Sequence, residues 1–285
     1  MITVDKAHKE AVKLLKMHLI ASPFLDATLL LSHCSNFNNN EILFKGEELL
    51  LSQNQYELFQ KLIEKRALKK VPISKLINHK EFFGLDFYVD EHVLDPRPDT
   101  ETLVEMVIFD HKDIENLNIV EVGTGSSCVI VAVIKSLINA KALALDISPN
   151  ALEVASKNIA RHRLSSRIKL LQSDLFSNLS TNLRFDILLS NPPYIPSHQI
   201  DLLEDEVRKH DPICALDGGK DGLNFYRSIA KNSKKFLKEH GYLYLEIGIN
   251  QYDAVKDIFE NDGWCLEKFQ KDLAGIIRVL KFKQA

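Results

Sequence analysis

The segment Asn118-Ile119-Val120-Glu121-Val122-Gly123-Thr124-Gly125-Ser126-Ser127 decides the fold, because an apolar strand runs directly into a glycine turn. Residues 118–122 form the short apolar run typical of a buried strand, and the two glycines predict a turn that opens a helix. Glycines let a backbone approach a ligand closely, and the N–H groups at a helix start can bind a carboxylate or phosphate. A lone Gly-x-Gly is equally typical of a βα turn without a ligand, so the neighbouring sequence decides its role.

Strand and helix patterns alternate from residue 118 onward. Such alternation predicts an α/β fold, in which a mostly parallel sheet carries helices on both faces. In these sheets, ligands bind outside the carboxyl ends of the strands. The expected strands are 118–122, 142–146, 168–172, 185–190, 242–247, 264–269 and 276–282, and the expected helices are 126–138, 149–161, 222–237 and 252–261.

Acidic side chains follow the second and third strands. Asp146 ends the second strand about 20 residues beyond the glycine turn, where nucleotide-binding sheets hold a ribose hydroxyl pair. Asp174 and Leu175 follow the third strand, where an acid and an apolar side chain could flank an adenine ring. Cys128 occupies the third position of Gly-x-Gly-x-x-Gly, and no Gly-Lys-Ser/Thr motif is present. S-adenosylmethionine therefore fits this set better than a dinucleotide or ATP.

The fourth strand ends in Asn191-Pro192-Pro193-Tyr194. Two consecutive prolines remove two backbone N–H donors, so the hydrogen-bond ladder of the strand cannot continue. The Asn191 amide offers an acceptor and two donors, and Tyr194 could close the slot with an aromatic face. Strand termination alone explains such a proline pair, but the glycines and acids upstream favour a slot for a planar amide or amine beside a methyl donor.

Helical patterns dominate residues 1–78. The asparagine-rich cluster 36–40 predicts a loop, and Ser52 with Gln55 forms a capping-box pattern that opens a further helix. The apolar residues at helical spacing in the first two expected helices are Ala11, Leu14, Leu15, Leu19, Leu25, Leu29 and Leu30.

A hairpin around Gly84 is expected within a linker over 79–95. After it, Arg97 stands pinned between two prolines, and a helix starts with Glu101 in its first turn. An acid in a first turn suits the helix dipole, which accounts for Glu101 without a functional role. The helix start does not explain Arg97, so this rigid, charged segment is expected to hold a bound molecule in place.

The composition is ordinary for a soluble globular protein, with 45% hydrophobic and 26% charged residues. The net charge of −3 gives no general surface for a polyanion, so no direct nucleic-acid binding is expected. The four cysteines are far apart and show no zinc spacing, which predicts reduced thiols and no metal site. No apolar signal region and no membrane-spanning stretch is visible, so a cytoplasmic protein without a membrane contact is expected.

Eight ordered motifs make the chain similar to a known family from about residue 26 to the C-terminus. It resembles the HemK/PrmC family, the N5-glutamine methyltransferases of class I peptide-chain release factors. The motifs are PRPDTE at 96–101, GTGS at 123–126, ALDISP at 144–149, SDLF at 173–176, NPPYI at 191–195, ALDGGKDGLNFY at 215–226, LEIG at 245–248 and DLAGIIR at 272–278.

The resemblance implies a class I, Rossmann-like, seven-stranded methyltransferase domain at 96–285 that depends on S-adenosylmethionine. It also implies a small helical domain at 1–78 that docks the substrate, and a β-hairpin linker at 79–95. The implied reaction methylates the glutamine of the release factor's Gly-Gly-Gln motif and so modulates translation termination. The enzyme is expected to be a monomer whose partner is the release factor.

The resemblance also assigns roles to single residues. The glycine loop would line the methionine part of the cofactor, Asp146 would hold the ribose, and Leu175 would lie near the adenine. Glu121 stands where an Asp is usual and Ser127 where a Gly is usual, and a Cβ at position 127 could crowd the cofactor loop. The implied cofactor-binding residues are Gly123, Thr124, Gly125, Ser126, Ser127, Asp146, Asp174, Leu175 and Asn191. The implied catalytic residues are Asn191, Pro192, Pro193 and Tyr194, with Arg97 and Glu101 positioning the substrate.

An amide nitrogen is a poor nucleophile because its lone pair is delocalised into the carbonyl. In the expected mechanism, the Asn191 side-chain oxygen and the Pro192 carbonyl accept both N–H bonds of the substrate glutamine. Three alternatives stay open. They are a ribosomal-protein glutamine methyltransferase, a nucleic-acid methyltransferase acting on adenine N6 or guanine N2, and a non-catalytic binding protein that has lost cofactor affinity through Ser127.

Overall fold

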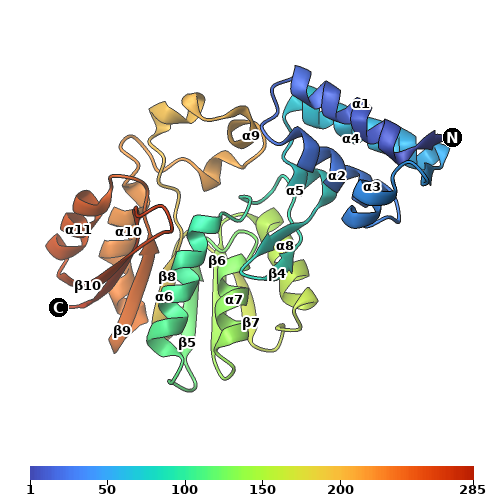
Figure 1. The fold of residues 1–285 in the computed structure, drawn as a ribbon. Coiled ribbons are helices and arrows are strands. Elements are labelled where there is room, and N and C mark those ends of the chain that lie inside the picture. Colours follow the sequence, from blue (N-terminus) through green and yellow to red (C-terminus); the bar gives the residue numbers. More distant parts are fainter. The chain divides into compact units, whose positions relative to one another are not determined.

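The structure is a computed structural model that describes all residues from Met1 to Ala285. The chain forms two compact units. Figure 1 shows the fold coloured from the N-terminus in blue to the C-terminus in red. Unit 1 comprises Met1–His79 together with the short segment Glu204–His210, and unit 2 comprises Lys80–Leu203 together with Asp211–Ala285. The segment Glu204–His210 lies within the range that the sequence analysis assigned to the methyltransferase domain.

Unit 1 is helical and has its own apolar core, which includes Leu15, Leu30 and Phe59. The predicted capping box is present, since Ser52 and Gln55 bond each other's backbone at the start of a helix. The helices are α1 (Val4–Met17), α2 (Pro23–Cys34), α3 (Asn39–Lys45), α4 (Gln53–Lys69) and α5 (Ile73–Ile77). Two short strands, β1 (Ile2–Thr3) and β2 (Leu50–Leu51), pair antiparallel and link the segments that precede α1 and α4.

Three local predictions for unit 1 were wrong. Leu19 is exposed because α1 ends at Met17 and Leu19 itself turns left-handed, with φ 56°. Leu25 is exposed in the first turn of α2. The predicted loop over 36–40 is shorter, because a second capping box between Asn38 and Glu41 starts α3 inside it.

Unit 2 contains the predicted seven-stranded sheet, in the order β10-β11-β9-β8-β5-β6-β7. Five strands run parallel, and β10 and β11 are antiparallel to their neighbours. The predicted α/β fold is thus confirmed. The strands are β5 (Asn118–Val122), β6 (Lys141–Asp146), β7 (Ile168–Gln172), β8 (Phe185–Ser190), β9 (Leu237–Glu246), β10 (Trp264–Lys271) and β11 (Ile277–Gln284).

Helices cover both faces of this sheet, as Figure 1 shows. The predicted helix over 222–237 ends earlier, because β9 already begins at Leu237. Short turns and helices in the connections are η1 (Pro98–Thr100), η2 (Ser197–Leu202), α9 (Asp205–Arg208), η3 (Ile213–Ala215) and η4 (Lys234–Phe236). One face carries α6 (Glu101–His111), α7 (Cys128–Ser136) and α8 (Pro149–Arg161), and the other carries α10 (Asn224–Ser233) and α11 (Tyr252–Asn261).

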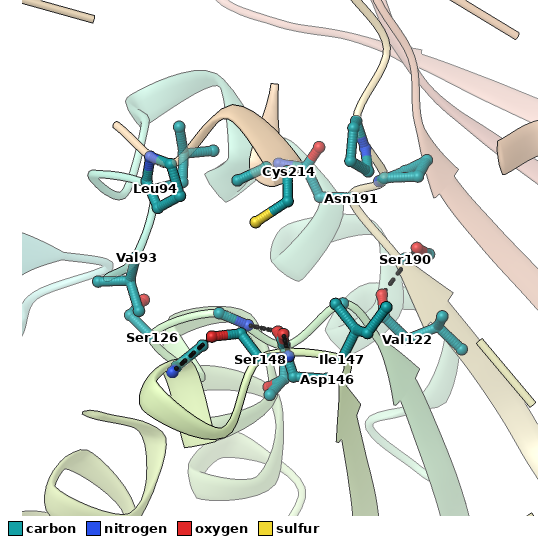
Figure 2. Close-up of a pocket in the computed structure, with 18 of the residues that line it drawn as sticks. Val93, Leu94, Val122, Ser126, Asp146, Ile147, Ser148, Ser190, Asn191 and Cys214 are labelled. Carbon is teal, nitrogen blue, oxygen red and sulfur yellow. Dashed lines mark hydrogen bonds between the residues drawn. The ribbon is translucent and has the colours of Figure 1, made fainter. Parts of the chain in front are cut away.

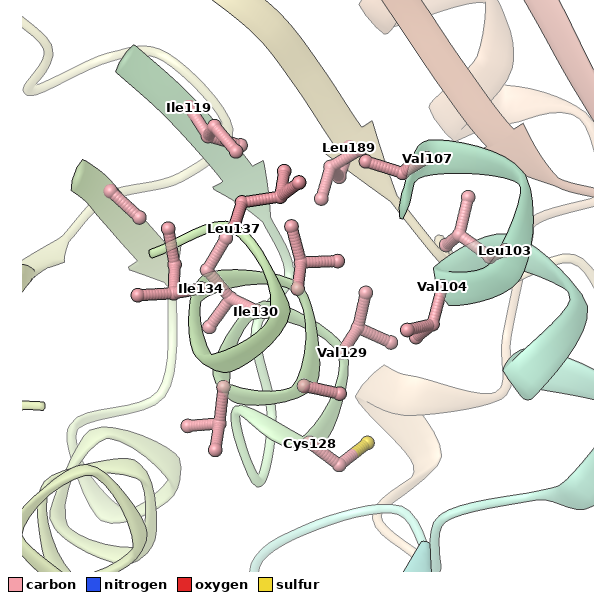
Figure 3. Close-up of a cluster of buried hydrophobic side chains, with 14 of the residues drawn as sticks. Leu103, Val104, Val107, Ile119, Cys128, Val129, Ile130, Ile134, Leu137 and Leu189 are labelled. Atoms are coloured by element: carbon pink, nitrogen blue, oxygen red, sulfur yellow. The ribbon is translucent and has the colours of Figure 1, made fainter. Parts of the chain in front are cut away.

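Helix α7 follows the glycine turn and is apolar on all sides. Every residue from Cys128 to Ile134 is buried, because the sheet lies on one side of the helix and α6 and α8 flank it. Figure 3 shows Val129, Ile130 and Ile134 within this cluster, with Leu189 of β8 and Val107 of α6 nearby. A helix buried on all sides cannot shift without losing packing, so the glycine turn at its start has a rigid base.

The predicted hairpin around Gly84 is present as β3 (Lys80–Phe82) and β4 (Leu85–Phe87). Its two turn residues, Phe83 and Gly84, both have positive φ, which is the backbone of the tight turn that matches strand twist. Phe82 and Phe87 are buried in the core that contains α6 and α7. No helix of the structure has the length and apolarity needed to cross a membrane.

Candidate functional site

A cavity of about 460 Å³ lies at the carboxyl ends of β5, β6, β7 and β8. This is the edge of the sheet where the sequence predicted a ligand site. Figure 2 shows Val122 of β5, Asp146 of β6 and Asn191 after β8 around it. Of the predicted site residues, it is lined by Arg97, Gly123, Thr124, Gly125, Ser126, Asp146, Asp174, Leu175, Asn191, Pro192 and Pro193.

The glycine loop presents bare backbone to the cavity. Gly123 and Gly125 have φ of 75° and 51°, in the left-handed region that favours glycine. A Cβ built on either residue would meet no protein atom within 4 Å, so both positions face open space. The Gly125 N–H donates to Asp146 Oδ2 at 2.8 Å, which joins the loop to the end of β6. The loop therefore forms a cradle, a space over its bare backbone that a side chain at Gly123 or Gly125 would fill.

Asp146 is held from two sides at the end of β6. Its Oδ2 accepts from Gly125, and its Oδ1 accepts from the Ser148 N–H at 3.0 Å. Burial raises the pKa of Asp146, and these backbone bonds oppose that shift. Ser148 caps α8 by accepting the Ala151 N–H. Each carboxylate oxygen keeps a second lone pair that can accept a hydroxyl.

Ser127 does not line the cavity, unlike the rest of the glycine loop. Its side chain is 0% exposed, its φ is 63°, and its hydroxyl lies 3.0 Å from Thr124 Oγ1. Thr124 in turn hydrogen bonds the Glu121 carboxyl, and burial raises the pKa of Glu121 to about 8. Two departures from the family pattern, Glu121 and Ser127, therefore belong to one buried network with Thr124, and Glu121 and Thr124 also line the cavity. The Ser127 side chain is buried in this network and is not part of the cavity lining.

Asn191 is oriented by a residue that the sequence analysis did not select. Its Nδ2 donates to the Thr100 hydroxyl at 3.1 Å, across 91 residues of sequence. The neighbouring Ser190 hydroxyl donates to the Val122 carbonyl at 2.8 Å, which ties β8 to β5 beside the cavity (Figure 2). With Nδ2 engaged by Thr100, the Asn191 oxygen is the atom left to meet a ligand.

Besides Ser127, two more predicted site residues lie outside the cavity lining. Tyr194 is anchored through its carbonyl, which accepts from Gln251 Nε2 at 2.9 Å, and burial raises the pKa of its phenol to about 12. Glu101 accepts the Phe83 N–H at 2.8 Å, so it ties α6 to the hairpin. Arg97 does line the cavity, and its guanidinium bonds the buried Asp211 at 2.7 Å.

The segment after Asp211 contributes a wall that sequence reasoning missed. Pro212, Ile213, Cys214 and Ala215 line the cavity, and Figure 2 shows Cys214 near Asn191. Val93 and Leu94 also line the cavity and contribute apolar atoms (Figure 2). The ALDGGKDGLNFY motif begins at Ala215 and was the sequence signal that could have pointed to this wall.

The residues present fit a nucleoside with a short charged tail. A glycine cradle, an acid with free lone pairs at a strand end, and the apolar side chain of Leu175 meet in one cavity. The described cavity carries no group of side chains that could hold a metal ion. The fold and this site together define a Rossmann-like methyltransferase, and residues 113–281 match the family model of a methyltransferase domain.

Comparisons with relatives narrow this class to one family. Residues 6–77 match the model of the PrmC N-terminal domain. The chain is 38% identical to a release factor glutamine methyltransferase of Agrobacterium fabrum over 99% of this chain and 98% of that protein. It is 37% identical to a bifunctional methyltransferase of Rickettsia felis, but spans only 54% of that relative. The chain belongs to the release factor glutamine methyltransferase family, which confirms the resemblance seen in the motifs.

The solved structures agree on the fold. A methyltransferase from Pyrococcus furiosus aligns with a TM-score of 0.53 over 81% of this chain and 98% of that chain, at 18% sequence identity. At this level of identity the likeness extends to the fold only.

Proposed function

We propose that this protein transfers the methyl group of S-adenosylmethionine to the side-chain amide nitrogen of the glutamine in the Gly-Gly-Gln motif of class I peptide-chain release factors. Membership of the release factor glutamine methyltransferase family supports this substrate. The observation that carries the proposal is Asn191, which lines a nucleoside-sized cavity, is held by Thr100 and is followed by Pro192 and Pro193.

In the proposed cofactor site, Asp146 accepts hydrogen bonds from the ribose hydroxyls, and Leu175 with Asp174 borders the adenine. The bare backbone of Gly123 and Gly125 leaves room for the methionine part. When bound, S-adenosylmethionine supplies an electrophilic methyl group on a positively charged sulfur. Ser127 acts from behind the loop, where its hydroxyl supports Thr124.

In the proposed acceptor site, the Asn191 oxygen and the Pro192 carbonyl accept the two N–H bonds of the substrate glutamine. These two acceptors would orient the nitrogen toward the methyl group and stabilise the positive charge that develops on it, and the methylated nitrogen would then release one proton to water. Tyr194 lies outside the cavity lining, and its carbonyl, held by Gln251, fixes the end of the turn. Arg97, fixed by Asp211, lines the cavity and orients the incoming peptide.

Methyl transfer tests the proposal directly. The protein is incubated with labelled S-adenosylmethionine and a recombinant release factor, either intact or with the Gly-Gly-Gln glutamine replaced by alanine. Mass spectrometry should find label on that glutamine alone. Asn191→Ala should lose the label while calorimetry shows that cofactor binding persists, because the acceptor slot alone is removed. Asn261→Ala, at the exposed end of α11, is the matched control and should keep full transfer.

Two results would contradict the proposal. The first is label on ribosomal protein or nucleic acid but none on the release factor, which would assign the slot to another acceptor. The second is absence of cofactor binding in the wild-type protein, which would leave a non-catalytic member of the fold.

A further inference from the structure

Glu246, the last residue of β9, is a buried acid that the proposed mechanism does not use. Glu246 is 1% exposed, and its Oε2 atom has no hydrogen-bond partner. A buried acceptor without a partner is costly, so such a group in a native fold calls for an explanation. Glu246 does not line the cavity. Two of its neighbours, Thr100 and Asn191, do line it.

The surroundings of Glu246 set its charge. Burial is the largest effect and raises its pKa to about 7, while side-chain hydrogen bonds with Thr100 and Asn191 and the charge of Arg278 oppose the shift. Arg278 acts through its charge, since its donors go to Asp272, Asp99 and the Ile247 carbonyl. The charged and titratable groups that face Glu246 are Arg278 on β11, Asp99 before α6, Tyr194 after β8, Tyr226 on α10 and Cys128 on α7.

The direction of the hydrogen bonds follows from the chemistry of the three groups. A carboxylate only accepts, so Glu246 in its ionised form receives the Thr100 proton. The Thr100 oxygen is then free to accept from Asn191 Nδ2, which is the bond observed at 3.1 Å. A protonated Glu246 can instead donate to Thr100, and the Thr100 proton can then point to an Asn191 amide turned by 180°.

The two orientations of Asn191 have opposite effects on the acceptor. With Nδ2 on Thr100, the Asn191 oxygen is presented to the cavity and accepts from the substrate amide. In the turned orientation the NH₂ group faces the substrate amide, and two donors oppose each other. Transfer in line with the methyl group requires the first orientation.

We propose that Glu246 is a positioning residue: as a carboxylate it accepts the Thr100 proton and an N–H of Asn191, and so holds the Asn191 oxygen toward the acceptor amide. This inference rests on the proposed function, because it assigns Asn191 to an amide acceptor. It adds a pH dependence to methyl transfer. The rate should rise with pH as Glu246 loses its proton around its pKa of about 7, and then level off.

The test compares isosteric variants. Thr100→Val removes the hydroxyl that joins Glu246 to Asn191, Thr100→Ser restores it, and Glu246→Gln cannot ionise. Thr100→Val and Glu246→Gln should each lower kcat on the order of 10-fold at pH 8 and change the cofactor KM by less than about twofold. Thr100→Ser should rescue most of the loss. Thr102→Val, a buried threonine two residues further along α6, is the matched control and should behave as wild type.

A second readout is independent of activity. Carboxyl-labelled glutamate should give one NMR resonance that titrates near pH 7 and is absent in Glu246→Gln. Thr100→Val removes a hydrogen bond that lowers this pKa, so the titration should move to higher pH. The decrease of kcat below pH 7 should move with it, and it should disappear in Glu246→Gln.

Failure of this inference is distinct from failure of the proposed function. Absence of label on the release-factor glutamine with wild-type protein overturns the function. Wild-type labelling with an unchanged kcat and pH profile in both Thr100→Val and Glu246→Gln overturns only the role of Glu246. A Glu246 resonance that titrates at the ordinary pKa of a glutamate would overturn the pH dependence assigned to Glu246.

Discussion

At the scale of single residues, Ser127 shows how a side chain can replace a glycine without blocking a loop. Its φ of 63° lies in the left-handed region, where a Cβ costs on the order of 1 kcal/mol. The side chain is buried and bonds Thr124, and it stays out of the cavity. Gly125, two residues earlier, differs from Ser127 because it lines the cavity, and a Cβ added there would occupy open space.

The first prediction compares these two positions. Ser127→Gly should change the dissociation constant for S-adenosylmethionine by less than about twofold, because the removed atoms lie outside the cavity. Gly125→Ala should weaken binding at least tenfold, equivalent to about 1.4 kcal/mol, because its Cβ adds strain at φ 51° and fills the cradle. Calorimetric titration measures both. Equal effects of the two substitutions would show that Ser127 also borders the cofactor.

Glu121 provides a second prediction at this scale. An unfolded chain releases the proton of this residue near its ordinary pKa of 4.5, whereas the fold keeps it up to about 8. The unfolded state therefore binds fewer protons between these values, and the free energy of unfolding should fall as pH rises through this window. The contribution approaches about 1.4 kcal/mol per pH unit. Urea unfolding at a series of pH values should show a smaller slope in Glu121→Gln.

The exposed Glu105 on α6 offers the matched control. Glu105→Gln should keep the wild-type dependence of unfolding on pH. A wild-type slope in Glu121→Gln would mean that this carboxyl is already ionised in the fold.

At the scale of elements, Asn158 joins three parts of the chain. It lies on α8 and is 0% exposed. Its Nδ2 donates to the carbonyls of Tyr88 and Ser126 at 2.9 Å each, and its Oδ1 accepts the Tyr88 N–H at 2.7 Å. One side chain thus connects the chain after the hairpin with α8 and with the glycine loop.

We predict that Asn158→Ala lowers the free energy of unfolding of unit 2 by about 2–4 kcal/mol, because three backbone groups lose their partner. Trp264 is the only tryptophan and is buried in unit 2, so its fluorescence in urea reports this unit. Ser156→Ala, on the exposed side of the same helix, should change the value by less than about 0.5 kcal/mol. A loss below 1 kcal/mol in Asn158→Ala would contradict the role of Asn158 as a link between elements.

At the scale of the whole molecule, each unit has a core of its own and a separate polar anchor. In unit 1, the buried Arg66 bonds Asp26 at 2.7 Å and Glu206 at 2.8 Å. Glu206 comes from the segment Glu204–His210, whose contacts place it in unit 1. The chain therefore returns to unit 1 once after unit 2 has begun.

Arg66→Ala should destabilise unit 1 by about 3–5 kcal/mol, because it leaves Asp26 buried without a counter-charge. Circular dichroism, which reports the helices of unit 1, should show an earlier transition in urea. The Trp264 fluorescence transition and the affinity for S-adenosylmethionine should stay at the wild-type value. Lys65→Ala, at the exposed neighbouring position on α4, is the control. A matching shift of the Trp264 transition would mean that the two units unfold as one.

The sequence could predict what depends on neighbours along the chain. The strands around Val122, Asp146 and Asn191 follow from local apolar runs, and the capping box at Ser52 follows from a spacing of three residues. Because parallel strands end at one edge of a sheet, placing these strand ends together needed only the strand assignments. Leu19 was misplaced for the complementary reason, since its helical spacing continues past the point where α1 actually ends.

By itself, then, the sequence determined the family, the class of fold and the edge of the sheet that holds the cavity, because motifs and periodicity are local properties. The tertiary structure decided which side chains meet there. It brought Thr100 to Asn191 across 91 residues, placed Glu246 within hydrogen-bond reach of both and left Ser127 out of the cavity lining. Such pairings are made by packing between elements distant along the chain, and no spacing within one segment encodes them.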